Sequence, residues 1–139
     1  GGQLRSQAVV LGIDLIERIE ANNVAAIAGS YAPATYPASF TADCSTAFCS
    51  PADLATYDLV NFKSRVQGQL PNASITVSMA GTGPVTYSVR IDWVERISKA
   101  KDTAVDTTGA SAVTSAGGGN TESFSYSITR MFQNRSLVI

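Results

Sequence analysis

Apolar residues recur at helical spacing from residue 3 to about residue 28, and this period predicts one long helix. Asn22 and Asn23 should weaken this helix, and Gly29 and Ser30 should end it. The positions that we expect to pack against a sheet or a neighbouring subunit are Leu4, Ala8, Leu11, Leu15, Ile16 and Ile19. Together with Val9 and Ile13 they cover roughly 200° of the helix surface, whereas packing on one sheet needs about 100°. The surplus indicates either a second partner or deep wrapping of the helix by its own domain.

The predicted helix has no N-cap signal. Gly1, Gly2 and Gln3 precede the first apolar position, and none of them is a Ser, Thr, Asp or Asn. We therefore expect the helix to continue from a segment that precedes this sequence in the natural protein. The sequence as given contains no run of about 18 apolar residues, the length expected of a membrane-spanning helix.

A second helix is predicted by its end signals. Ser50 occupies the N-cap position, Pro51 the first helical position, and Asp53 places a carboxylate in the first turn. Pro71 ends the pattern. The stretch between the two helices, residues 30–49, shows no regular period and is expected to be irregular.

Three later stretches alternate between apolar and polar residues, as half-buried strands do. They are residues 75–79, 85–93 and 124–128. Residues 98–121, rich in Ser, Thr, Ala and Gly, are expected to form a flexible connection between the last two. The order predicts one α+β domain over residues 1–139, with a long N-terminal helix on an antiparallel sheet and a second helix in the connection.

The composition of the chain excludes several classes of partner and site. Ten basic and eleven acidic residues leave a formal net charge of -1, which gives no reason to expect nucleic acid as a partner. Histidine, the commonest general base and metal ligand, does not occur in the chain. We therefore expect no catalytic site, no metal site, no cofactor and no small-molecule substrate.

Cys44 and Cys49 are the two cysteines of the chain, separated by four residues. We predict that they close a short loop as a disulfide, which would contribute about 2 kcal/mol in the entropic model. A disulfide would indicate an oxidising compartment. The alternative is a pair of buried free thiols in a cytosolic protein.

Two polar clusters in the sequence are candidate sites. Asp92 and Glu95 could form a carboxylate pair, but Asp92 alternates with apolar residues and should face solvent. Arg96, Lys99 and Lys101 form a small basic cluster without interleaved aromatic residues. We expect this cluster to be solvated or to contact an acidic neighbouring subunit rather than to bind DNA.

Two segments resemble PilV-type minor pilins of type IV pili. The first is residues 5–22, in which a helix carries Asp14, then Arg18 four residues later, and then Asn22. The second is residues 49–71, from the sequence Cys-Ser-Pro-Ala-Asp to a closing Leu-Pro.

The resemblance implies a pilin-like fold and a structural subunit, not an enzyme, that assembles with other minor pilins and the major pilin to initiate or cap the pilus. It implies a leader and a hydrophobic helix that anchor the full-length protein in the inner membrane, facing the periplasm, before it joins a cell-surface pilus. Major pilins usually carry their disulfide near the C-terminus, whereas both cysteines here precede the sheet. The alternatives are a type II secretion minor pseudopilin and an adhesin-type binding head that uses residues 98–121.

Overall fold

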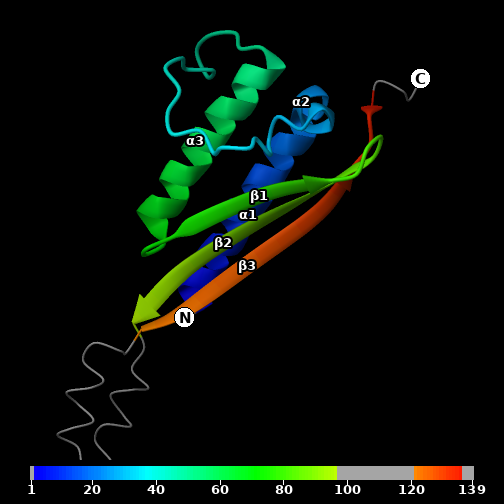
Figure 1. The fold of residues 1–139 in the computed structure, drawn as a ribbon. Helices are drawn as coiled ribbons and strands as arrows, with labels where there is room; N and C mark the ends of the chain where they lie inside the picture. Colours follow the sequence, from blue (N-terminus) through cyan, green and yellow to red (C-terminus); the bar gives the residue numbers. More distant parts are fainter. Residues whose placement is uncertain (1, 97–120, 136–139) are drawn as a thin grey trace, which may run out of the picture.

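The computed structural model describes residues 2–96 and 121–135. Its elements, in chain order, are α1 (Gly2–Ala21), α2 (Asn23–Ala28), α3 (Pro51–Gln69), β1 (Ser74–Ala80), β2 (Val85–Arg96) and β3 (Thr121–Phe132). The strands form a three-stranded antiparallel sheet in the order β1-β2-β3. Helices α1 and α3 lie on one face of this sheet (Figure 1). The predicted α+β class and the order of its elements are confirmed.

The helix expected from residue 3 to about residue 28 is interrupted at Asn22, where the sequence predicted weakening, and it ends before Gly29 as expected. Asn22 leaves the helical conformation, with φ -110° and ψ 59°, and separates α1 from α2. Its side-chain amide donates hydrogen bonds to the Tyr31 hydroxyl at 3.1 Å and to the Pro51 carbonyl at 2.8 Å. A short amide side chain that bonds elsewhere competes with helical geometry, and here it breaks the helix. Gly29, in the left-handed conformation, then ends α2.

Helix α3 begins and ends where its signals place it. The Ser50 hydroxyl accepts a hydrogen bond from the Asp53 backbone N–H at 3.1 Å, and Pro51 opens the first turn. The helix ends at Gln69, and Leu70 has an extended backbone conformation. One face of the helix is buried through Ala55, Asp58, Leu59, Phe62 and Val66.

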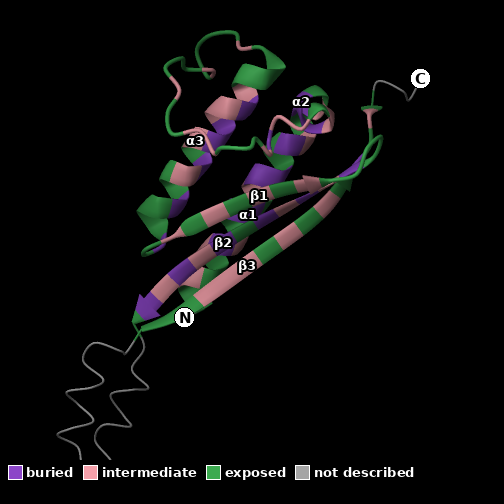
Figure 2. Ribbon diagram, viewed as in Figure 1, coloured by how far each residue is buried: buried purple, intermediate pink, exposed green. Residues whose placement is uncertain are grey.

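The two faces of the sheet differ in chemistry. Along β2, buried residues alternate with less buried ones (Figure 2). The buried set is Val85, Tyr87, Val89, Ile91 and Trp93, which joins the core under the helices. The opposite face carries mainly hydroxyl side chains, from Ser74, Thr76, Ser78, Thr86, Ser88, Thr121, Ser123, Ser125, Ser127 and Thr129. Two of them, Ser88 and Thr129, share a hydrogen bond of 2.9 Å across β2 and β3.

Helix α1 occupies the centre of the fold, since it packs on β2 and β3 and also contacts α3. Gly12 permits this close packing on β3, because a Cβ at that position would lie 2.9 Å from Tyr126 Cε2. The predicted flexible connection, residues 98–121, lies outside the described residues except for Thr121, which pairs with Arg96. Within the described part of the chain, no helix is both long enough and apolar enough to cross a membrane.

Candidate functional site

The apolar positions predicted for packing on the first helix lie in the core of this chain. Ala8, Leu11, Leu15, Ile16 and Ile19 are at most 1% exposed, and Leu4 packs against them while partly buried. The sheet and α3 together cover this side of α1. Wrapping by the same domain therefore accounts for most of the broad apolar arc, and these positions are not open to a second partner.

A smaller apolar strip of α1 stays exposed. Val10 is 64% exposed and Ile13 is 36% exposed. Residues three apart are neighbours on a helix surface, so these two side chains adjoin. The sequence pattern included Ile13 in the apolar arc but missed Val10, which lies beside the main stripe.

An ion-pair network joins α1 to α3. The Asp14 carboxylate accepts hydrogen bonds from Arg18 Nε at 2.9 Å and from Arg65 Nη1 of α3 at 2.8 Å. Burial acts to raise the pKa of Asp14, but the hydrogen bonds from both arginines outweigh burial and hold that pKa below its usual value. The Asp14 carboxylate therefore pairs with one arginine of its own helix and with one arginine of α3.

A buried polar cluster continues from this network. Asp58 Oδ2 accepts a hydrogen bond from the Tyr31 hydroxyl at 2.6 Å. The same hydroxyl accepts a hydrogen bond from the Asn22 side-chain amide at 3.1 Å. Arg18 Nη1 lies 3.5 Å from Asp58 Oδ1. Burial raises the pKa of the Asp58 carboxyl, although the Tyr31 hydrogen bond and Arg18 lower it in part. Burial also raises the pKa of Tyr31, and the hydrogen bond to Asp58 adds to that shift.

The spacing of Asp14, Arg18 and Asn22 thus has a structural meaning. At four-residue intervals the three side chains lie along one side of α1, where they meet α3 and the chain that leads into it. Sequence reasoning noted these three residues but missed their partners Tyr31 and Arg65. Asp58 lies within the second resembling segment, residues 49–71, but was given no role. A signal existed, because Asp58 is a carboxylate on the otherwise apolar face of the second helix.

The predicted disulfide is present: Cys44 and Cys49 are bonded, with an S–S distance of 2.08 Å. The loop that they close is tied to α3 through Asp43. The Asp43 carboxylate accepts hydrogen bonds from the Ser45 backbone and hydroxyl and from the Tyr57 hydroxyl, at 3.0, 2.6 and 3.1 Å. Phe48 projects from this loop and is 93% exposed.

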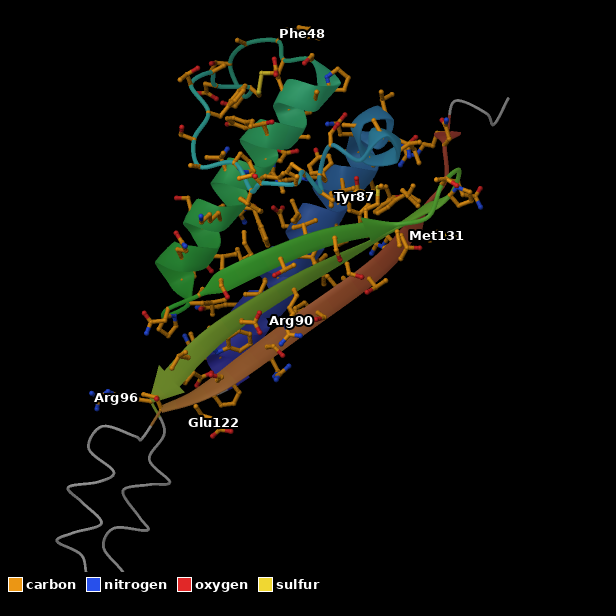
Figure 3. The ribbon with its side chains drawn as sticks, viewed as in Figure 1. Phe48, Tyr87, Arg90, Arg96, Glu122 and Met131 are labelled. Atoms are coloured by element: carbon orange, nitrogen blue, oxygen red, sulfur yellow. A yellow bond between two sulfur atoms is a disulfide. The ribbon has the colours of Figure 1, made fainter. Side chains whose placement is uncertain are left out.

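A cavity of about 510 Å³ separates the disulfide loop from the helices. Its lining comes from α1, the loop and α3, and consists of Asp14, Arg18, Cys44, Ser45, Leu54, Tyr57, Asp58, Asn61, Phe62 and Arg65. The loop end of the molecule, marked by Phe48, lies opposite the end that carries Arg96 and Glu122 (Figure 3).

The remaining polar candidates do not gather into a site. Asp92 is bonded to Arg90 on the outer face of the sheet, at 3.0 and 3.1 Å. Glu95 lies on the opposite face and accepts a hydrogen bond from Trp93 Nε1 at 2.7 Å, so the two carboxylates do not pair. Among residues 2–96 and 121–135, no group of three or more His, Cys, Asp or Glu side chains could hold a metal ion.

Arg96, from the predicted basic cluster, is exposed at the end of β2. Lys99 and Lys101 lie outside the described residues.

The long N-terminal helix packed on an antiparallel sheet, with a further helix between them in the chain, defines a pilin-like α+β domain. Residues 1–60 match the family model of Tt1218-like proteins, described as type IV pilin Tt1218. The match covers less than half of the 139-residue chain. It spans α1, α2, the disulfide loop and the start of α3. Searches of curated proteins and of solved structures gave no match.

Proposed function

We propose that this chain is the globular part of a PilV-type minor pilin, which takes part in initiating or capping a type IV pilus. It would assemble with other minor pilins and with the major pilin. The full-length protein would be anchored in the inner membrane before assembly. A structural role of this kind needs no catalytic group, no cofactor and no small-molecule substrate, in keeping with a chain that contains no histidine.

One observation carries the proposal: α1 is buried on one side in its own domain and exposes Val10 and Ile13 on another. A helix that packs between subunits of a fibre needs a second apolar surface besides the one that holds its own domain together. The family match over residues 1–60 supports the structural role, and the resemblance of residues 5–22 and 49–71 supports the PilV type.

The test is to replace Val10 and Ile13 by glutamate in the full-length protein. Both side chains are exposed, so each substitution should change the free energy of unfolding by no more than about 0.5 kcal/mol. Surface pili, counted by electron microscopy in a strain that lacks the native gene, should be lost because a charge would then enter an apolar subunit contact.

A matched control is Val24→Glu, the same change at a valine of α2 that is 67% exposed. This variant should restore pili. Normal piliation with Val10→Glu and Ile13→Glu would overturn the proposed contact. Unfolding of the isolated chain by both substitutions, despite their exposure, would also count against it.

The same helix surface would serve a type II secretion minor pseudopilin. The discriminating result is restoration of protein secretion, rather than of pili, by the wild-type gene. The adhesin hypothesis relied on residues 98–121. The residues bounding the undescribed stretch, Arg96 and Thr121, pair with each other near the start of α1, where the Arg5 guanidinium lies 6.0 Å from the centre of the Trp93 ring. No described residue specifically favours that hypothesis.

A further inference from the structure

We propose that Glu17 selects which other pilin packs on the exposed strip of α1, because it requires a lysine or arginine on the contacting surface of that pilin. This inference rests on the proposed function, since it concerns the same helix surface and names the chemistry of its partner. The strip consists of Val10, Ile13 and Glu17, all of which are exposed. It therefore joins two apolar side chains to one carboxylate.

The three side chains lie in one row along the helix. Ile13 follows Val10 by three residues, and Glu17 follows Ile13 by four, so each side chain adjoins the next on the helix surface. At a rise of about 1.5 Å per residue, the row is about 10 Å long. A partner that carries an apolar patch beside one cation would contact all three side chains at once.

The Glu17 carboxylate makes no hydrogen bond or ion pair with any described residue. The other two carboxylates of α1 are neutralised within the chain. Asp14 pairs with two arginines at 2.9 and 2.8 Å, and Glu20 pairs with Arg130 at 3.0 Å. Because these arginines are engaged by Asp14 and Glu20, the described part of the chain supplies no cation to Glu17.

The charge of Glu17 separates a pilin surface with a cation from other neighbours. A lysine or arginine would pair with this carboxylate at the edge of the apolar contact. A surface that placed an acidic residue there would be rejected, since like charges that meet in an interface cost more than an exposed ion pair gains. An anionic lipid surface would be repelled in the same way. The strip therefore fits a protein rather than the membrane surface.

A second copy of this chain is the weaker fit. Its described cations are held by carboxylates or by aromatic rings of their own chain, with the exception of Arg96. Arg96 ends β2. The cation that Glu17 requires is therefore expected on a different pilin.

The test is Glu17→Lys in the full-length protein, in a strain that lacks the native gene. The new lysine would lie three residues from both Asp14 and Glu20, a favourable spacing for opposite charges. The isolated variant should therefore unfold at the Tm of the wild type or at a higher one. Surface pili, counted by electron microscopy, should nevertheless fall roughly tenfold or more, because two cations would meet in the contact. Normal piliation would overturn the proposal.

Glu122→Lys is the matched control. Glu122 is a second exposed glutamate whose carboxylate has no described partner, and it lies on β3, where it pairs across the strands with Glu95. The variant makes the same change of charge away from the strip and should restore pili to the wild-type number. Equal loss of pili in both variants would show a general effect of net charge and would overturn the role of Glu17.

The partner is identified by reversing its charge. In the Glu17→Lys strain, the exposed lysines and arginines of the co-assembled pilins are replaced by glutamate one at a time. One of these changes should restore pili, and the same change beside wild-type Glu17 should abolish them. If none restores pili, the proposal fails. Restoration by Arg96→Glu in this chain would assign the contact to a second copy, and would overturn the assignment to a different pilin.

This inference and the proposed function can fail separately. If Val10→Glu and Ile13→Glu abolish pili while Glu17→Lys keeps them, the strip is a subunit contact in which Glu17 selects nothing. If all three variants are normally piliated, the proposed subunit contact is itself wrong.

Discussion

At Gly12 the helix α1 meets β3 without room for a side chain. An added Cβ would lie 2.9 Å from Tyr126 Cε2 and 3.4 Å from Ile128 Cγ2. In a helix interior, alanine stabilises relative to glycine by about 1 kcal/mol. Overpacking a filled site costs about 1–3 kcal/mol. We therefore expect Gly12→Ala to lower the free energy of unfolding by about 1 kcal/mol net, and to lower Tm by about 4 °C.

Gly68 provides the control, since no described atom would lie within 4 Å of a Cβ there. Gly68→Ala should raise the free energy of unfolding by about 1 kcal/mol, and urea unfolding followed by circular dichroism measures both variants. In a Tyr126→Leu background, Gly12→Ala should become stabilising, because the ring that opposes it is gone. Equal stabilisation by Gly12→Ala and Gly68→Ala in the wild-type background would refute the close approach of α1 and β3.

Three further changes test other parts of the fold by urea unfolding. Ser50→Ala should lower the free energy of unfolding by about 1 kcal/mol, because the Asp53 N–H loses its capping oxygen. Replacing Cys44 and Cys49 by serine should lower it by about 2 kcal/mol, and thiol titration of the denatured, unreduced wild type should find no free thiol. Burial raises the pKa of Asp58, so between the unfolded pKa, about 3.9, and the raised folded value the folded chain holds a proton that the unfolded chain has released. Wild type should therefore lose stability relative to Asp58→Asn as pH rises from about 4 to 7, and a relative gain over that interval would show that Arg18 outweighs burial.

Features that depend on neighbours in the chain were predictable from the sequence. The cap at Ser50 and Pro51 is local, so the start of α3 could be placed to the residue. The alternation along β2 likewise reports its buried face, because successive residues point to opposite sides of a strand. The spacing of the two cysteines allowed a bond but did not require one.

Features that depend on distant partners were not predictable. Asn22 breaks the helix because the fold brings Tyr31 and the Pro51 carbonyl to its side chain. The spacing of apolar residues along the helix gives no information about these two partners. The breadth of the apolar arc showed how much of α1 would be covered, but not that α3 would cover it. For the same reason the cavity was missed, since its lining joins three separate stretches of the chain.

The contrast between the two faces of the sheet determines how its strands align. Many hairpins take their register from a tight turn directly between the strands, whereas residues 97–120 of the sequence separate β2 from β3. A slip by one residue would turn Tyr87, Val89, Ile91 and Trp93 toward solvent and bring arginine, aspartate and serine into the core. At about 1.5–3 kcal/mol per large apolar side chain, that error costs on the order of 10 kcal/mol, comparable to the whole stability of a typical domain. The burial of apolar side chains therefore sets the register of β2 and β3. The connection between these strands can change in length without shifting that register.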